Sequence, residues 1–598
     1  MGPPPQRRTF VWRFASPREA IWPILADTAR FNEAAKLPKH TIEEIPQRDG
    51  SVRYIGRARR GPFALEWREK PVNWVANRWF EHCRYFRSGP LKSLCATFVL
   101  ADEGAGSRGE YTIEARPANP LGRLILSTRF FESTARTFGA LADDAARFAL
   151  GESPIPFRYR PPEIPQPVRA RVAAMAARIE DSGRGHGLAQ RLAEHVMGAQ
   201  EVDLVHLRPL KLARDWGADP RHVIELCLEA VRAGMLALRW DLLCPRCRIA
   251  KAAVAALDQL PRGAHCATCN IPYDADFSKN VELSFSPAPA VRPIEAGEYC
   301  LFGPMSTPHI WIHLTLGPGE ERRVAADLAP GPYRLRTLEP GPEIDIDWSG
   351  GGFPEVIIEA DRIRAGAPAE PGEAVLSNRS GRELTAIVEE LHWVRDALTA
   401  DRVTAMQAFR DLFSDQVLRP GDEVSIRRVA LMFTDLRGST ALYSDVGDAS
   451  AYHLVREHFA FLAAIVRAHN GAVVKTIGDA IMAAFGDPAD ALGAALEVQR
   501  EVTAFNQGSG GRALVIKLGL HEGPCIAVTL NGRLDYFGSS VNMAARLQAQ
   551  SRGGDIVLSR AFAEDSAVRP LLDPFEPAEE SIDLKGFEER VTFFRLSP

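Results

Sequence analysis

The 598-residue chain lacks the features that mark membrane, secreted and nucleic-acid-binding proteins. No apolar run approaches the roughly 20 residues that a membrane-spanning helix needs. The start, Met1 to Arg8, is rich in proline and arginine and has no apolar core of a secretory signal. The formal net charge of −4 creates no global attraction to nucleic acid. We therefore expect a cytoplasmic protein with no transmembrane segment and no nucleic-acid partner.

Cysteine is also scarce, with nine residues in the chain, too few to predict a disulfide framework. Four of them form two pairs, Cys244-Pro-Arg-Cys247 and Cys266-Ala-Thr-Cys269, with 18 residues between the pairs. Two residues between thiolates let one tight turn present both sulfurs to one ion, and two such turns complete a tetrahedron. The spacing predicts one structural zinc ion, with His265 as an alternative donor.

A chain of this length exceeds one hydrophobic core, so several domains are expected. The sequence pattern predicts a multidomain α+β protein in five parts. Residues 8–151 hold many short strands and a long closing helix, and residues 152–168 form a proline-rich linker. Residues 169–370 are predicted as helices, then the cysteine pairs, then strands. A connecting helix, from about Leu384 to Phe413, is predicted within 371–423, and residues 424–598 form the last domain.

The order of elements in residues 8–151 is a helix, many strands and a long helix from about Leu121 to Leu150. This order resembles the START-like helix-grip fold, in which a sheet wraps around the closing helix and leaves an apolar cavity. The resemblance implies an apolar small-molecule ligand. The alternative is a small α+β domain with no ligand.

In the last domain, carboxylates stand where predicted strands end. Residues 428–433 predict a buried strand that leads into Thr434-Asp435, and Gly478-Asp479 joins two further predicted strands as a hairpin. The order strand, helix, hairpin, helix, strand is the βαββαβ ferredoxin-like pattern. Asp435 and Asp479 at neighbouring strand ends suit a pair of Mg or Mn ions on a polyphosphate.

Other polar residues in this domain are less easily explained by folding alone. Lys475 interrupts a strand built for burial, and a buried lysine needs a partner. Asn542 and Arg546 are four residues apart on a predicted helix, so they share one face. An amide and a guanidinium on one face suit the orientation of a sugar and the clamping of a phosphate. Taken singly, each residue also fits a cap, a turn or a solvated surface.

Together, in this order and spacing, the set resembles the class III adenylate/guanylate cyclase catalytic domain over about residues 424–596. The residues at its functional positions are Asp435 and Asp479 for two metals, Lys475 and Asp535 for the adenine edge, Asn542 and Arg546 for the ribose and the transition state, and Lys585 for the triphosphate.

The purine-reading pair bears on the substrate. Guanylate-specific members carry Glu where Lys475 stands and typically Cys where Asp535 stands, whereas this chain has the adenine pair. The resemblance thus implies an adenylate cyclase that converts ATP to 3′,5′-cyclic AMP and pyrophosphate, by two-metal-assisted attack of the ribose 3′-hydroxyl on the α-phosphate. A guanylate or mixed-specificity cyclase, a non-catalytic scaffold and a zinc-ribbon nucleic-acid binder are the alternatives.

Two further implications concern assembly and regulation. Family sites form between two cyclase domains, so one domain with every expected residue implies a homodimer. Upstream, Trp240 with the cysteine pairs, Pro308-His309 and residues 409–413 resemble a domain of unknown function that often precedes bacterial cyclases. We interpret this region as a regulatory or dimer-positioning module.

Overall fold

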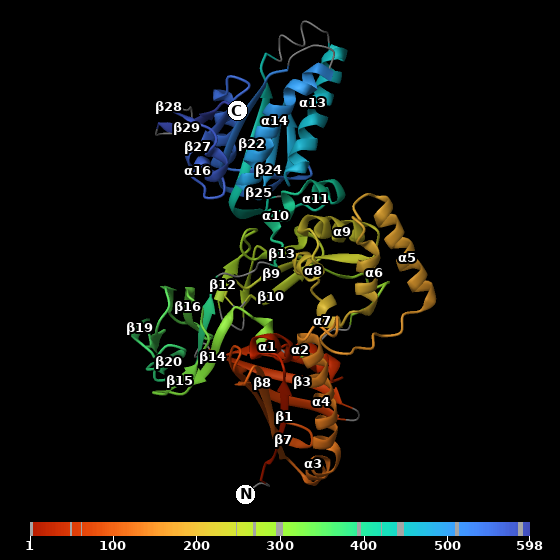
Figure 1. Ribbon diagram of the computed structural model, residues 1–598, viewed down its shortest axis with the longest axis vertical. Coiled ribbons are helices and arrows are strands. Elements are labelled where there is room, and N and C mark those ends of the chain that lie inside the picture. The colour runs from red at the N-terminus through yellow and green to blue at the C-terminus, as the bar shows by residue number, and fades with distance from the viewer. Residues whose placement is uncertain are drawn as a thin grey trace.

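The computed structural model places its four folded units in an elongated arrangement (Figure 1). It describes residues 4–47, 51–60, 63–246, 248–266, 271–294, 299, 303–391, 396–419, 421–438, 448–508, 514–583 and 590–598. The N-terminal and C-terminal domains lie at opposite ends, and the helical middle module lies between them. Within these residues, no helix combines the length and the apolar character that crossing a membrane requires.

The N-terminal domain is an antiparallel sheet that packs around the long helix α4 (Phe131–Ala149). The strands, in spatial order, are β1 (Gln6–Phe14), β8 (Gly106–Pro117), β7 (Leu91–Glu103), β6 (Trp79–Phe86), β4 (Phe63–Glu69), β3 (Val52–Arg60) and β2 (Thr41–Pro46). Two shorter helices are α1 (Arg18–Leu25) and α2 (Thr28–Ala34), and α3 (Pro120–Ile125) leads through a π-helical segment (Leu126–Phe130) directly into α4. The order of helix, strands and long helix is the one that the sequence predicts.

A disulfide joins Cys83 on β6 to Cys95 on β7. The two residues lie directly opposite each other in the antiparallel register of these strands. The scarcity of cysteine argued against a disulfide framework, and this single cross-strand bond did not follow from the sequence. Its partners are decided by strand register, which a count of cysteines does not contain.

The middle module begins with five helices and continues with five strands. They are α5 (Gln166–Asp181), α6 (Ala189–Gly198), α7 (Glu201–Leu204), α8 (Pro209–Trp216), α9 (Pro220–Arg232), β9 (Leu236–Leu243), β10 (Ala250–Val254), β11 (Gly263–Cys266), β12 (Ile271–Asp274) and β13 (Val281–Pro287). The predicted proline-rich linker before α5 has neither helix nor strand over residues 152–165. It is anchored rather than free, because Phe157 is fully buried against Phe31 of the N-terminal domain.

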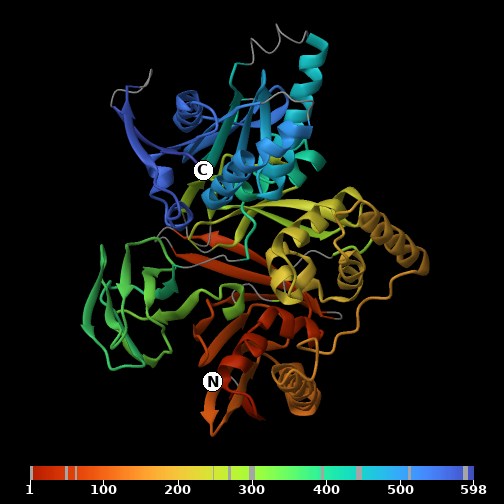
Figure 2. The ribbon, with the colours of Figure 1, turned by 45° about the horizontal axis from the view of Figure 1, so that its top comes forward.

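The β-rich unit that follows is separate from the helical module, so the prediction of one domain over residues 169–370 was wrong. Its strands β14-β21-β16-β17 belong to the same 12-stranded sheet as the N-terminal strands, and they pack around a shared core with a separate four-stranded sheet, β15-β20-β18-β19. Their bounds are β14 (Ile310–Leu316), β15 (Glu321–Ala325), β16 (Gly331–Thr337), β17 (Glu343–Trp348), β18 (Pro354–Ile358), β19 (Ile363–Pro368), β20 (Glu373–Asn378) and β21 (Leu384–Glu390). Figure 2 shows this green unit beside the red N-terminal sheet, to which β14 pairs through β5 (Asn73–Val75).

The connecting helix predicted from about Leu384 to Phe413 was also wrong in its first part. Residues 384–390 form the buried strand β21, which pairs with β14 and β16. The run Leu-Thr-Ala-Ile-Val is rich in β-branched residues, which fit a pleated buried surface better than a helix. Only two short helices follow in the described part of this segment, α10 (Ala400–Thr404) and α11 (Gln407–Leu412).

The C-terminal domain confirms the predicted βαββαβ pattern. Its first elements are β22 (Glu423–Leu436), α13 (Asp448–Ala468), β23 (Ala472–Ile477), β24 (Ala480–Phe485), α14 (Pro488–Gly508) and β25 (Ile516–Leu530). The strands lie in the order β23-β24-β22-β25. The remaining elements are β26 (Arg533–Phe537), α15 (Ser539–Gln550), β27 (Ile556–Ser559), α16 (Arg560–Ala563), α17 (Arg569–Leu572), β28 (Ala578–Ile582) and β29 (Val591–Leu596).

The two faces of this sheet have different neighbours. Alternate residues of β22, such as Ala430 and Met432, pack with α13 and α14 on one face. Leu431 and Phe433 point to the other face, whose core is continuous with that of the middle module. The middle module therefore reaches the sheet from the side that carries α15.

Candidate active site

The two predicted metal carboxylates meet at one edge of the central sheet. Asp435 is near the end of β22, and Asp479 is in the two-residue turn between β23 and β24, where Gly478 has a φ of +65°. Thr434 Oγ1 accepts a hydrogen bond from the Ile481 N–H at 3.2 Å, which holds the turn beside the strand end. Antiparallel pairing of β22 with β24 thus brings together carboxylates that are distant in the sequence.

The electrostatics of this edge fit a divalent cation. Burial, and then the charge of Asp479, raise the pKa of Asp435 above its ordinary value. Asp479 Oδ2 is buried and makes no hydrogen bond to any described residue. Carboxylate oxygens are the ligands that Mg and Mn prefer. A cation here would relieve the repulsion between the two carboxylates and give the unsatisfied oxygen a partner. Asp435 and Asp479 would hold the metal, and the buried Asp479 Oδ2, which has no hydrogen-bond partner among the described residues, would be one of its ligands.

Sequence reasoning missed two residues beside these carboxylates. Lys517 lies opposite Asp435 in the register of β22 and β25, and its charge favours the ionised carboxylate. His458 on α13 is fully buried near Asp479, and burial lowers the pKa of His458 to about 4, so the imidazole is neutral. The helical periodicity of α13 is the only sequence signal for His458, since it places this residue on the inner face.

The predicted purine-reading residues form an ion pair. Lys475 Nζ donates to Asp535 Oδ2 at 2.7 Å, and Asp535 Oδ1 accepts the Tyr536 N–H at 2.7 Å. The Lys475 side chain is 35% exposed and that of Asp535 is 10% exposed, so the pair lies at an accessible surface. The partner that the sequence demanded for Lys475 is therefore Asp535.

Asn542 and Arg546 are both exposed on α15. Among the described residues, neither side chain makes a hydrogen bond or an ion pair, so both are available to a ligand or a second chain. Lys585 lies outside the described residues.

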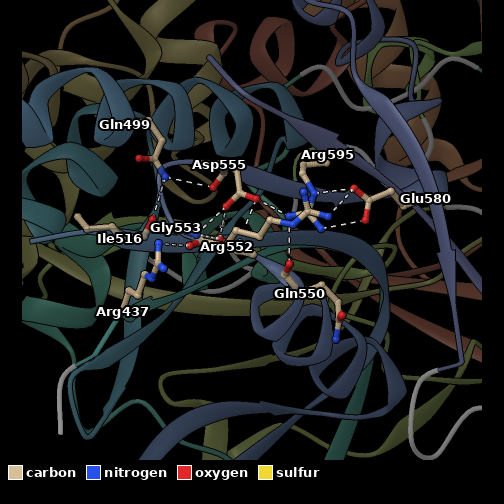
Figure 3. Close-up of polar contacts among 10 residues, drawn as sticks. Arg437, Gln499, Ile516, Gln550, Arg552, Gly553, Asp555, Glu580 and Arg595 are labelled. Carbon is tan, nitrogen blue, oxygen red and sulfur yellow. Dashed lines mark hydrogen bonds and ion pairs between the residues drawn. The ribbon is translucent and has the colours of Figure 1, made fainter. Parts of the chain in front are cut away.

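The C-terminal end of α15 is fixed by a buried polar network. Figure 3 shows Arg595 between Asp555 and Glu580. The Arg595 guanidinium pairs with Asp555, donates to Glu580 at 2.8 and 3.0 Å, and donates to the Gln550 carbonyl at 3.0 Å. Arg437, two residues after Asp435, donates to the Arg552 carbonyl at 3.2 Å. The network ties the helix that carries Arg546 to the strand that carries Asp435.

A family model of the adenylate and guanylate cyclase catalytic domain matches residues 422–594. Residues 422–594 are thus an adenylate/guanylate cyclase catalytic domain. A second model, of a family of unknown function, matches residues 175–302, which include Trp240 and all four cysteines of the two pairs.

The similar proteins match this chain over part of its length. An adenylate cyclase of Lachancea kluyveri is 34% identical over 179 residues, 26% of this chain and 10% of that protein. An uncharacterized protein of Mycobacterium tuberculosis is 28% identical over 242 residues, 40% of this chain and 59% of that protein. The structure of the adenylyl cyclase CyaB from P. aeruginosa, 22% identical, aligns with 29% of this chain and 95% of that one, with a TM-score of 0.27. The chain thus spans less than two thirds of these curated relatives.

The predicted zinc ligands are described only in part. Cys244 after β9 and Cys266 at the end of β11 are fully buried in one small cluster, with Ile249, Ile271 and Tyr273 around them. Cys247 and Cys269 lie outside the described residues. The first cysteine of each pair therefore lies in the same small core.

A second candidate site is a cavity of about 650 Å³ in the N-terminal domain. Most of its lining is apolar, with Leu94, Phe86 and Phe138 among the wall residues. One part is polar, where His40, His82 and Arg84 line the wall.

The polar wall of this cavity has little net charge. Arg84 pairs with Glu69 at 3.0 Å. Burial lowers the pKa of His40 to about 4 and that of His82 to about 3, so both rings are neutral at pH 7. His40 Nε2 is buried and makes no hydrogen bond to a described residue. The cavity therefore suits an apolar molecule with an uncharged hydrogen-bonding group.

Proposed function

We propose that the cyclase domain is an adenylate cyclase that converts ATP to 3′,5′-cyclic AMP and pyrophosphate. The observation that carries the proposal is the Lys475–Asp535 pair. A lysine donates and a carboxylate accepts, which complements the ring nitrogen and the exocyclic amine of adenine. Guanine presents a carbonyl where adenine presents the amine, so this pair complements guanine less well. A guanylate or mixed-specificity cyclase is the alternative hypothesis.

The chain's own residues supply positioning and charge. The Arg546 guanidinium is placed to stabilise negative charge that develops on the α-phosphate, and the Asn542 amide to orient the ribose. Attack of the 3′-hydroxyl oxygen forms the new bond to the α-phosphorus as the bond to pyrophosphate breaks, so no protein nucleophile is required. When bound at Asp435 and Asp479, two Mg or Mn ions would activate the hydroxyl and neutralise the triphosphate. Lys585 is proposed as a further triphosphate contact.

The site is proposed to form between two copies of the chain. Asn542 and Arg546 are exposed, and neither side chain makes a hydrogen bond or an ion pair with a described residue of its own chain. Exposed apolar residues flank the purine-reading pair, Ile477 at 50% and Phe537 at 62% exposure. Apolar side chains on this face gain stability when a second copy covers them. A homodimer would carry two equivalent sites.

The test is product formation by the purified full-length chain with ATP and with GTP, each with Mg and with Mn. Asp479→Ala is the inactive reference. Cyclic AMP from ATP that disappears in the variant supports the proposal, whereas cyclic GTP product of equal yield favours mixed specificity. If the full chain is inactive but residues 424–598 alone are active, the upstream modules inhibit the cyclase domain. Inactivity of both leaves a non-catalytic scaffold.

The middle module is proposed to hold one structural zinc ion on Cys244, Cys247, Cys266 and Cys269. A closed four-thiolate shell would stabilise the module and take no part in chemistry. Elemental analysis of the purified protein should find one zinc per chain, reduced in Cys244→Ser. If the purified wild-type protein contains no zinc and melts at the same temperature as Cys244→Ser, this assignment is refuted.

The N-terminal domain is proposed to bind an apolar small molecule that regulates the cyclase. The 650 Å³ cavity is the observation that favours it. Fatty alcohols and aromatic ketones should raise the melting temperature of the full chain, and Ala96→Trp, which fills the cavity wall, should abolish that rise. No shift with any compound of either class would favour a domain without a ligand.

A further inference from the structure

Helix α11 lies outside both matched regions but contacts the strands that carry the purine-reading pair. The matches cover residues 175–302 and 422–594, and α11 spans Gln407–Leu412. Strand pairing joins β23 to β24 and β26 to β25. Lys475 and Asp535 thus stand on strands that are not neighbours in the sheet, which links them through β24, β22 and β25.

Gln407 makes the first attachment, to β23. Its Oε1 accepts the Val473 N–H at 2.9 Å, and its Nε2 donates to Asp411 Oδ1 at 2.7 Å, which fixes the orientation of the amide. β23 is the outer strand of the sheet, and its register shifts between Val473 and Lys475. A bulge of this kind re-aims the side chain that follows it. Gln407 therefore holds the strand at the irregularity that directs Lys475.

Arg410 makes the second attachment, to β26. Its Nη1 donates to the Leu534 carbonyl at 3.0 Å, and its Nε donates to the Thr404 carbonyl at 2.7 Å. The guanidinium carbon lies 5.4 Å from the centre of the Tyr536 ring. Asp535 stands between Leu534 and Tyr536, the two residues of β26 that Arg410 contacts. A guanidinium is suited to this task because its planar fork serves two carbonyls and a ring face at once.

The middle module fixes α11 from the opposite side. Phe409 is buried, and its ring meets the edge of the Trp240 ring with centres 5.9 Å apart. Trp240 Nε1 donates to Gln416 Oε1 at 3.0 Å, just beyond the helix. Hence the helix that touches both purine-reading strands is itself mounted on β9 of the middle module.

We propose that Gln407 and Arg410 are positioning residues for base recognition: α11 clamps β23 and β26 so that Lys475 and Asp535 meet the purine edge in register. The proposal rests on the proposed cyclase function. It makes the base selectivity of the cyclase domain depend on a helix that lies outside that domain. It also gives the middle module a physical route to the site.

The kinetic test uses the full chain with Arg410→Lys, Arg410→Ala and Gln407→Leu. Arg402→Ala, exposed on the neighbouring helix α10, is the matched control. The three clamp variants should raise KM for ATP about five- to tenfold and lower the ATP-to-GTP ratio of kcat/KM about tenfold, with kcat changed less than about twofold. The control should match wild type. Unchanged selectivity, or a fall in kcat alone with an unchanged KM, would overturn the proposal.

A second measurement separates the clamp from the cyclase function. Hydrogen–deuterium exchange without nucleotide should become faster at Val473 in Gln407→Leu and over residues 533–537 in Arg410→Ala, but not in Arg402→Ala. If the wild-type chain forms no cyclic nucleotide, the proposed function fails and exchange alone decides. Unchanged protection of both strands would then overturn the clamp. Arg410→Lys, which keeps the charge and the alkyl stem, guards against loss of folding in the alanine variant.

Discussion

Lys475 donates to Asp535 at 2.7 Å although their strands, β23 and β26, belong to different strand pairs of the sheet. The contact links two residues that are 60 positions apart. The proposed preference for ATP rests on this contact, and a different local feature positions each of its two residues. A register shift precedes Lys475, and the backbone N–H of Tyr536 holds Asp535.

Reversing the charge of Lys475 should remove the preference for ATP. In Lys475→Glu, two carboxylates face each other and neither donates to adenine, so kcat/KM for ATP should fall about 100-fold or more. Adding Asp535→Cys relieves the repulsion and should raise activity with GTP above that of the single variant. Cyclic AMP and cyclic GMP are measured for both nucleotides. Retention of ATP activity in Lys475→Glu would show that this pair does not read the base.

Mixing two inactive variants should restore activity if the site spans two chains. Asp479→Ala lacks a metal carboxylate and Arg546→Ala lacks the phosphate contact, so a mixed dimer has one intact site. Random pairing of equal amounts predicts about one quarter of wild-type activity. The measurement is cyclic AMP formation after the two proteins are co-refolded or exchanged. Activity no higher than either variant alone, with dimers verified by light scattering, would place all site residues within one chain.

Divalent metal should stabilise the protein through Asp435 and Asp479. Burial, and then repulsion from Asp479, raise the pKa of Asp435, which means that the ionised pair costs stability at neutral pH when no cation is present. Asp435→Asn should raise the melting temperature in EDTA by about 1–3 °C and should lose most of the rise that Mn produces in wild type. Asp573→Asn, on the exposed surface, is the control. An equal rise with Mn in wild type and Asp435→Asn would mean that the metal binds elsewhere.

Acid should weaken the junction between the N-terminal domain and the β-rich unit. His313 on β14 stacks on Trp74 of β5 with ring centres 4.2 Å apart, and burial lowers the pKa of His313 to about 3. Because the folded pKa lies below that of the unfolded chain, the unfolded state binds the extra proton. The stability that neutral His313 contributes is therefore complete above about pH 7, and it is lost as the pH falls through 6.5 toward 3.

The size of this effect follows from the ordinary pKa of histidine. Between pH 8 and pH 5, His313 should lower the free energy of unfolding by up to about 2 kcal/mol. His313→Phe, which keeps a ring on Trp74, should flatten the pH dependence of thermal unfolding, and exposed His222→Phe should not. Equal acid sensitivity in wild type and His313→Phe would assign it to other groups.

Loss of Arg595 should destabilise the end of α15. Asp555 is 5% exposed and is paired with Arg595, so Arg595→Met leaves a buried carboxylate with one partner fewer. A loss of about 2–4 kcal/mol is expected for the cyclase domain. Urea unfolding of residues 424–598 measures it, with exposed Arg569→Met as the control. A change below about 0.5 kcal/mol in Arg595→Met would show that the network in Figure 3 adds little to stability.

Much of the candidate site was predictable because its signals are local. Gly478-Asp479 between two apolar runs predicts a hairpin from turn chemistry alone, and a buried strand that ends in Asp435 predicts a carboxylate at the sheet edge. Spacing by four residues places Asn542 and Arg546 on one helix face. The position of Lys475 in an apolar strand predicts a partner for it, since burying an unpaired charge is costly.

Other features were decided by tertiary structure, because they depend on register and packing between distant segments. Residues 384–390 form a strand because β14 and β16 pair with them on either side. Strand register brought Cys83 opposite Cys95, and the curvature of a sheet around α4 made a cavity that no local pattern contains. The sequence by itself determined which residues can do the chemistry. Only the packing of α11 against β23 and β26 decided how Lys475 and Asp535 are held, since hydrogen bonds between elements form where the fold places them.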